Sequence, residues 1–166
     1  MTGKPTSRRA VSRSAARLGV VQALYQMDIA GRPLNEVLAE YSTIRLGERF
    51  EDGEIGEADS AFLKDVVEGV VEHQRTIDRA TDACLAEGWT LGRLDATLRA
   101  ILRAGAYELL YRTDIPARVA VAEYVHVASA FFDERETKFV NAALDALARE
   151  RRAADYGDGR KAGDKT

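Results

Sequence analysis

Apolar residues recur at three- and four-residue intervals along most of this chain. The first such stripe contains Val11, Ala15, Leu18, Val21, Tyr25 and Ile29. This spacing places side chains on one face of an α-helix, whereas a half-buried strand alternates apolar and polar residues at every second position. Only 3 of the 166 residues are proline, so the residue type that most strongly ends helices is scarce. The sequence therefore predicts an all-α fold.

Helix boundaries are expected where the apolar pattern stops. The first helix should cover about 7–30 and end at Gly31, and a short second helix should run from Pro33 to about Thr43. Apolar stripes then cover 59–87, and the pattern leaves open whether this stretch bends. The last three stripes run from Leu94 to Leu109, from Val121 to Ala128 and from Phe139 to Leu147. The pattern gives about seven helices.

Length and composition predict one compact domain over residues 1–150. With 46% apolar and 31% charged residues, the chain has the composition of a soluble globular protein. The single cysteine, Cys84, falls in a helical apolar pattern, so we expect a core position, no disulfide and a reducing compartment. Residues 45–58 are rich in glycine and acidic residues and predict a solvated loop, since their spacing is not that of an EF-hand. Residues 151–166 have little to bury and predict a disordered tail.

Charge is strongly segregated along the sequence. From Met1 to Met27 there are five basic side chains and no acidic one, so this segment carries +5. The rest of the chain holds 19 basic and 27 acidic side chains, which gives −8. Clustered arginines gain affinity for phosphates by releasing condensed counterions, so the pattern favours nucleic acid as a partner. The alternative is that the basic N-terminus is only a solvated tail.

Motifs that carry catalysis or hold cofactors are missing from the sequence. The two histidines, His73 and His126, lack a partner at the spacing of a zinc site, and there is no glycine-rich phosphate loop or nucleophile elbow. We therefore expect no enzymatic activity, no metal and no cofactor. No apolar run approaches the roughly 18 residues of a membrane span, and no secretory signal is present, so a cytoplasmic location is expected.

Five sequence motifs carry a resemblance to a known family. The first two are ARLGVVQALYQMD from Ala16 and FLKDVVEGV from Phe62. The other three are LRAILRAGAYELLYRTDIP from Leu98, VAVAEYVHVASAF from Val119 and TKFVNAALD from Thr137. In this order and at these separations they resemble the NusB family of transcription antitermination and ribosomal RNA processing factors. The combination of KFVN with YELL is the most specific part of the resemblance.

The resemblance implies an all-helical fold of two small bundles without catalytic activity. It implies binding to the single-stranded boxA element of leader and ribosomal RNA, together with NusE, a small-subunit ribosomal protein, within the RNA polymerase antitermination complex. Carried over position by position, it implies an RNA-binding set of Arg8, Arg9, Arg13, Arg17, Tyr25, Lys138 and Phe139. The guanidinium groups of arginines form paired hydrogen bonds with phosphates, and exposed aromatic rings stack on bases. At helical spacing, however, Tyr25 and Phe139 also fit core positions.

Three further residues near these motifs have expected roles. Asn141 is interpreted as a structural residue that bonds to nearby backbone rather than to RNA. Glu108, in the YELL word, is also interpreted as structural. Arg135 stands where the family pattern favours acidic or small polar residues, so we expect it to add to RNA affinity or to change RNA selectivity.

Two alternative functions remain open at this stage. The same helical module occurs at the N-terminus of ribosomal RNA cytosine methyltransferases, but only 18 residues, from Arg149 to Thr166, follow the last expected helix. A methyltransferase domain would need a doubly wound sheet with a glycine-rich loop, so this chain would serve that class only as a fragment. The other alternative is a helical homodimer that buries its arginine face.

Overall fold

The computed structural model describes residues 8–40 and 57–157. In chain order the elements are α1 (Arg8–Ala30), α2 (Leu34–Glu40), α4 (Glu57–Glu72), α5 (Gln74–Asp82), the 3₁₀ helix η2 (Leu91–Arg93), α6 (Ala96–Tyr111), α7 (Ala117–Phe131), α8 (Glu134–Arg151) and α9 (Ala153–Tyr156). The all-α prediction is confirmed. The described ranges hold eight α-helices where about seven were expected.

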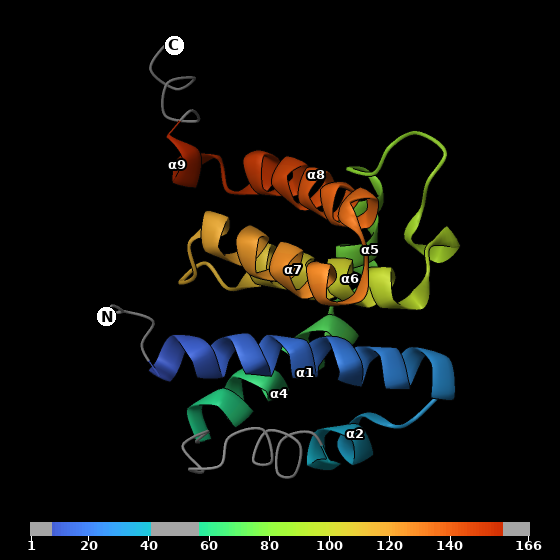
Figure 1. Ribbon diagram of the computed structural model, residues 1–166, viewed down its shortest axis with the longest axis vertical. Helices are drawn as coiled ribbons and strands as arrows, with labels where there is room; N and C mark the ends of the chain where they lie inside the picture. The colour runs from blue at the N-terminus through green and yellow to red at the C-terminus, as the bar shows by residue number, and fades with distance from the viewer. Residues whose placement is uncertain (1–7, 41–56, 158–166) are drawn as a thin grey trace.

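Helix α6 is the centre of the structure (Figure 1). It packs against α1 and α4 on one side and against α7 and α8 on the other. Most of its residues are buried, including Ile101, Leu102 and Leu109. An amphipathic helix needs only one apolar stripe, so a helix buried on nearly every face must join two packed groups. This arrangement gives the two small bundles that the family resemblance implied, with α6 shared between them.

Two glycines allow helices to approach closely. A Cβ at Gly105 of α6 would lie 2.8 Å from Leu144 Cδ1, and one at Gly69 of α4 would lie 2.1 Å from the ring of Tyr107. A Cβ at either position would force these side chains to move, because such contacts are shorter than normal van der Waals distance. Glycine at both positions lets the neighbouring side chains pack directly against the backbone.

Several helix ends fall where the sequence predicts them. Gly31 has a φ of 66°, in the left-handed region that glycine tolerates, and it follows the last residue of α1. Asp95 caps α6 by accepting hydrogen bonds from the amides of Thr97 and Leu98. The open question over residues 59–87 is answered by His73, which separates α4 from α5.

The predicted limits of the domain need a correction. Helix α8 extends to Arg151, and α9 follows it at once, so the prediction of a disordered tail from residue 151 is wrong for 151–157. Arg152 is only 8% exposed, and its guanidinium donates hydrogen bonds to the carbonyl oxygens of Leu109 and Ile115. These contacts fasten the segment to the end of α6 and the connection that follows it. Residues 158–166 lie outside the described part of the chain.

The prediction for the loop at 45–58 can be checked only at its end. Residues 45–56 lie outside the described part, and α4 already begins at Glu57.

Cys84 is half-buried at the edge of the core rather than inside it, and its thiol lies 3.8 Å from a carboxylate oxygen of Glu150.

Candidate nucleic-acid interface

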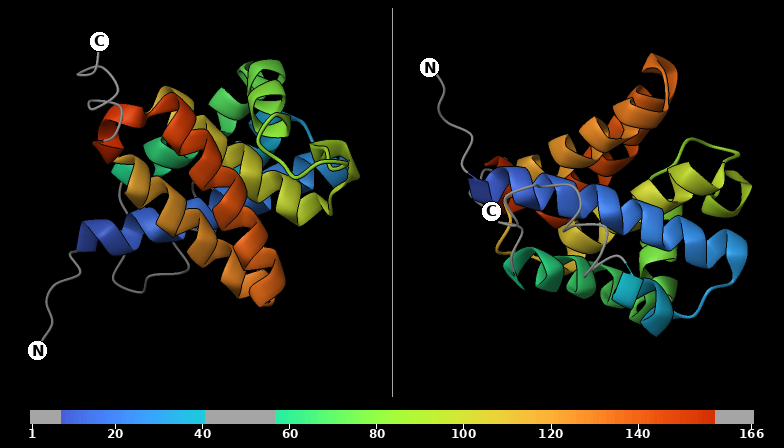
Figure 2. Two further views of the ribbon diagram at one scale, coloured as in Figure 1. Left: turned by 90° about the horizontal axis from the view of Figure 1, so that it is seen from above. Right: turned by 60° about the horizontal axis from the view of Figure 1, so that its bottom comes forward.

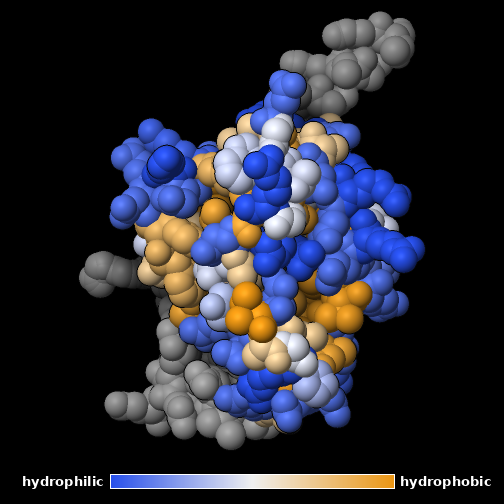
Figure 3. Space-filling view, turned by 90° about the vertical axis from the view of Figure 1, so that its right-hand side faces the viewer, coloured by the Kyte–Doolittle hydropathy of each residue, from blue (hydrophilic) through white to orange (hydrophobic). Residues whose placement is uncertain are grey.

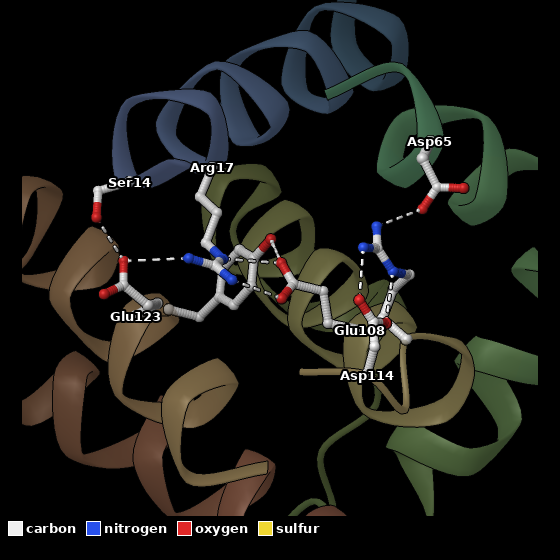
Figure 4. Close-up of polar contacts among 8 residues, drawn as sticks. Ser14, Arg17, Asp65, Glu108, Asp114 and Glu123 are labelled. Atoms are coloured by element: carbon white, nitrogen blue, oxygen red, sulfur yellow. Dashed lines mark hydrogen bonds and ion pairs between the residues drawn. The ribbon is translucent and has the colours of Figure 1, made fainter. Parts of the chain in front are cut away.

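The side chain of Arg17 points into the protein, not toward solvent. It is 3% exposed and forms two hydrogen bonds with the carboxylate of Glu108, from Nε over 2.9 Å and from Nη2 over 3.0 Å (Figure 4). Its Nη1 lies 3.4 Å from Glu123, which also accepts a hydrogen bond from Ser14. A guanidinium held in this way is not available to RNA. The prediction that Arg17 binds RNA is therefore wrong, and we withdraw it.

Glu108 is the centre of this buried network. It is fully buried and also accepts a hydrogen bond from the hydroxyl of Tyr124. Burial alone would lower the pKa of Arg17, but the hydrogen bonds and charge of Glu108 outweigh it and raise the pKa. Burial, followed by the charge of Glu108, raises the pKa of Tyr124 well above its usual value. The structural role expected for Glu108 is confirmed, since it joins α1, α6 and α7.

The inward position of Arg17 follows from how α1 is rotated. Spacing by four places Arg9, Arg13 and Arg17 on one face of the helix, but it does not say which way that face points. In the structure the face turns toward α4, where the guanidiniums of Arg13 and Arg17 lie 4.4 and 5.1 Å from the ring centroid of Phe62. Arg13 is half-buried there. Arg8 and Arg9 lie in the first turn of α1, and their side chains lie outside the described part.

The same rotation brings Tyr25 to the surface. Tyr25 is 37% exposed and Ile29 is 58% exposed, although both belong to the apolar stripe predicted to be buried. Ala16, Val20 and Leu24 are buried instead. The open question for Tyr25 is thus answered, because its ring is a surface group and not part of the core. The predicted stripe is wrong at Tyr25 and Ile29 and correct at Val21, which is buried.

A groove at the start of α8 brings together two other predicted residues and one that was missed. It has a volume of about 420 Å³ and is lined by Trp89, Leu94, Leu98, Arg135, Glu136 and Phe139. Phe139 is half-buried, and its ring meets that of Trp89 edge to face with centroids 6.4 Å apart. Trp89 itself is 44% exposed. Trp89 was not among the predicted RNA-binding residues, although a lone tryptophan in a polar segment was an available signal for a binding residue.

Two basic side chains lie beside this groove. Arg135 lines it and is exposed, and Lys138 is exposed with its ammonium 3.2 Å from Glu134 on the same helix. Such exposed pairs contribute little and leave the lysine accessible to another anion. Asn141, one turn further along α8, is exposed, and its side chain makes no hydrogen bond with the described residues. The interpretation of Asn141 as a residue bonded to nearby backbone is therefore wrong.

The structure divides the predicted residues between two ends of the molecule. Helix α1 begins at one end, and its last turn reaches the other end, where Asp28 pairs with Arg99 near the start of α6 over 2.9 Å (Figure 1). The start of α6 borders the Trp89–Phe139 groove, so Tyr25 and the groove lie toward the same end. Figure 3 shows the face of the molecule at this end, where apolar patches interrupt a polar surface. The arginines at the start of α1 lie at the opposite end (Figure 2).

Comparison with known sequences identifies the family. A family model described as the NusB family matches residues 14–149. The chain belongs to the NusB family. A relative from Rhodopseudomonas palustris (strain TIE-1), named transcription antitermination protein NusB, is 53% identical over 152 residues, which cover 92% of this chain and 87% of the relative. One of the same name from Maricaulis maris (strain MCS10) is 52% identical, with 92% and 95% covered.

Solved NusB structures share the fold. That of T. maritima NusB superimposes with a TM-score of 0.74 at 28% identity, covering 94% of this chain and 99% of the other. A crystal structure of the antitermination factors NusB and NusE in complex with dsRNA gives a TM-score of 0.70 at 26% identity, covering 87% and 99%. The resemblance to the NusB family, which rested on five sequence motifs, is therefore confirmed. The relatives' name describes an action in transcription and not a catalysed reaction.

Within residues 8–40 and 57–157, no group of three or more acidic, histidine or cysteine side chains is placed to hold a metal ion. None of the helices in these ranges is long and apolar enough to cross a membrane. The groove and the arginine-rich start of α1 thus remain the candidate sites.

Proposed function

We propose that this NusB-family chain is a non-enzymatic antitermination factor that binds boxA-type single-stranded RNA of ribosomal RNA leaders together with NusE. The observation that carries the proposal is the groove between Trp89 and Phe139, with Arg135 and Lys138 beside it. The family membership reported above supports the action in transcription.

The groove has the chemistry that single-stranded nucleic acid requires. A single strand exposes the flat faces of its bases, and each base stacked on an aromatic side chain contributes about 1–3 kcal/mol. Trp89 offers an exposed ring, and Phe139 holds that ring edge to face from α8. Arg135 and Lys138 then meet the phosphates between stacked bases. In a duplex the bases are already stacked on each other, so we expect this groove to favour single strands.

The second part of the proposed interface is the start of α1. Arg8, Arg9 and Arg13 remain candidate phosphate contacts, with Arg17 withdrawn. Arg13 lies over Phe62 and is only half-buried, so its position is fixed while part of it faces solvent. Each phosphate contact to single-stranded RNA contributes a slope of roughly 0.7 to the dependence of affinity on salt. The start of α1 thus supplies affinity without sequence selection, and the groove supplies the contacts to bases.

NusE is the proposed protein partner, in a complex that acts on RNA polymerase. A solved relative of this fold is described as bound to NusE and to double-stranded RNA. Because that RNA is a duplex, the preference for a single strand is the part of the proposal that most needs a test.

A fluorescence-polarisation titration tests the proposal. Labelled boxA-like single-stranded RNA, a scrambled strand and a duplex of the same length are titrated with the protein, with and without NusE, at 50 and 200 mM salt. We expect the boxA-like strand to bind most tightly and NusE to increase its affinity. Equal binding of all three RNAs would overturn the boxA assignment. If no RNA binds and solution mass shows a dimer, the homodimer alternative gains support instead.

A further inference from the structure

Tyr156 lies between two arginines from different helices. The guanidinium of Arg118 on α7 and that of Arg149 on α8 each lie 4.5 Å from the centroid of the Tyr156 ring. Both arginines are exposed, and the ring is half-buried beneath them. Attraction between a guanidinium and an aromatic face restricts how the arginine moves. The two cations are therefore held in fixed positions instead of being spread over many rotamers.

The short helix that carries Tyr156 is itself fixed to the fold. The carboxylate of Asp155 accepts a hydrogen bond from the amide of Ala117 over 2.8 Å, and it pairs with Arg152 over 2.7 Å. Ala117 is the first residue of α7, so Asp155 caps that helix from a distance in sequence. Arg152 in turn bonds the carbonyl oxygens of Leu109 and Ile115. This anchoring makes Tyr156 a rigid support for the two arginines.

Both arginines are exposed to solvent, where an outside anion can reach them. No carboxylate in the described part of the chain pairs with Arg118. Arg149 pairs with Asp145 over 2.9 Å, but both side chains of that pair are well exposed. Exposed pairs of this kind are worth little in water, so a phosphate can compete with the aspartate. Arg151, at the end of α8, adds a further exposed cation.

The position of this support connects it with the proposed RNA path. Helix α9 and the first turn of α1 lie on the same side of the molecule, with the start of α7 between them in the first view (Figures 1 and 2). The arginine-rich segment of α1 begins there. In a chain with a net charge of −3, basic residues of α1, α7 and α8 thus lie on one side of the molecule. We expect an RNA strand bound at the start of α1 to continue toward Arg118 and Arg149.

We propose that Arg118 and Arg149, supported by Tyr156, form a second phosphate-binding surface that extends the RNA path beyond the start of α1. The proposal rests on the RNA-binding function proposed above and adds contacts with RNA outside the boxA element. Guanidinium forks match the oxygens of a phosphate, and arginines that are already ordered lose less entropy when they bind. Such contacts read no bases, so the surface adds affinity for longer RNA of any sequence.

The test compares two double variants that remove the same charge. Arg118→Gln/Arg149→Gln removes the proposed surface. Arg75→Gln/Arg79→Gln removes two exposed arginines from α5, whose side chains make no hydrogen bond or ion pair with the described residues. Each protein is titrated with a short boxA-like RNA and with the same RNA extended by uridines at both ends. Thermal unfolding of both variants confirms that they are folded before binding is compared.

We expect the first double variant to lose affinity only for the extended RNA. Loss of two contacts lowers the salt slope by about 1.4, so between 50 and 200 mM salt wild type should lose about sevenfold more affinity than this variant. The control variant should behave as wild type. Extended RNA that binds both double variants with the same affinity and salt slope would overturn the second surface alone. If wild type binds neither RNA, the proposed function fails, and this proposal fails with it.

Discussion

Arg17 and Glu108, which are 91 positions apart in sequence, form a buried ion pair that joins α1 to α6. The carboxylate is fully buried, and Tyr124 of α7 donates a third hydrogen bond to it. Charge at this site is therefore neutralised within the protein, and the two helical bundles are tied together through it. The pair explains why one arginine of the basic segment has a role different from its neighbours.

Replacing Arg17 with methionine should strongly destabilise the protein. The change leaves the buried carboxylate of Glu108 without its cation, and breaking a buried pair from one side typically costs about 3–5 kcal/mol. Urea unfolding followed by circular dichroism measures the loss. Arg32→Met is the matched control, since Arg32 pairs with Glu36 and Glu40 at the surface, and its loss should destabilise the protein far less. Equal losses in the two variants would contradict a special role for the buried pair.

Asp155 should make stability depend on pH below 4. The hydrogen bond from the Ala117 amide, followed by the contact with Arg152, lowers the pKa of Asp155 below its usual value. The unfolded chain therefore binds a proton more readily than the folded one. The contribution of Asp155 is complete above the unfolded pKa of about 3.9 and is lost as pH falls through the lower folded pKa.

An Asp155→Ala variant isolates this contribution. Loss of the cap on α7 should cost about 0.5–2 kcal/mol at pH 7. The difference in unfolding free energy between wild type and variant should shrink between pH 4 and pH 2, as measured by urea titrations at each pH. A difference that stayed constant over this range would show that the charge of Asp155 is not what stabilises the segment.

Trp89→Ala should weaken RNA binding with little effect on stability. The ring is 44% exposed, so its removal leaves no cavity in the core, whereas loss of one stacked base costs about 1–3 kcal/mol of binding free energy. Tyr111→Ala is the control, because Tyr111 is 37% exposed and lies at the far end of α6 from the groove. Polarisation titrations and thermal melts of both variants separate the two effects. Full RNA affinity in Trp89→Ala would remove the groove from the proposed interface.

Arg135→Asp tests the cation at the rim of the groove. A like charge facing phosphates should reduce affinity for every RNA sequence and reduce the salt slope. Lys64→Asp is a control with the same change of charge at an exposed position on α4. Competition titrations with boxA-like and scrambled RNA measure both affinity and selectivity. An Arg135→Asp protein that binds boxA-like RNA as tightly as wild type would rule out a contribution from this arginine.

The sequence by itself determined the helical class and some of the helix ends. Periodicity of three and four residues requires helices, and Gly31 and Pro116 stand at ends because of their backbone preferences. The motif words also determined the family. These properties depend on neighbours along the chain, so they can be read without knowing the fold.

Tertiary structure decided how each helix faces its neighbours. Spacing fixed that Arg13 and Arg17 share one side of α1, but only packing against α4 and α6 turned Arg17 inward and Tyr25 outward. The meeting of Trp89 with Phe139, 50 positions later, also depends on how α8 lies over the segment before α6. Rotating a helix about its axis leaves its sequence pattern unchanged while it exchanges buried and exposed side chains. The orientation is therefore set by long-range packing, which local periodicity does not encode.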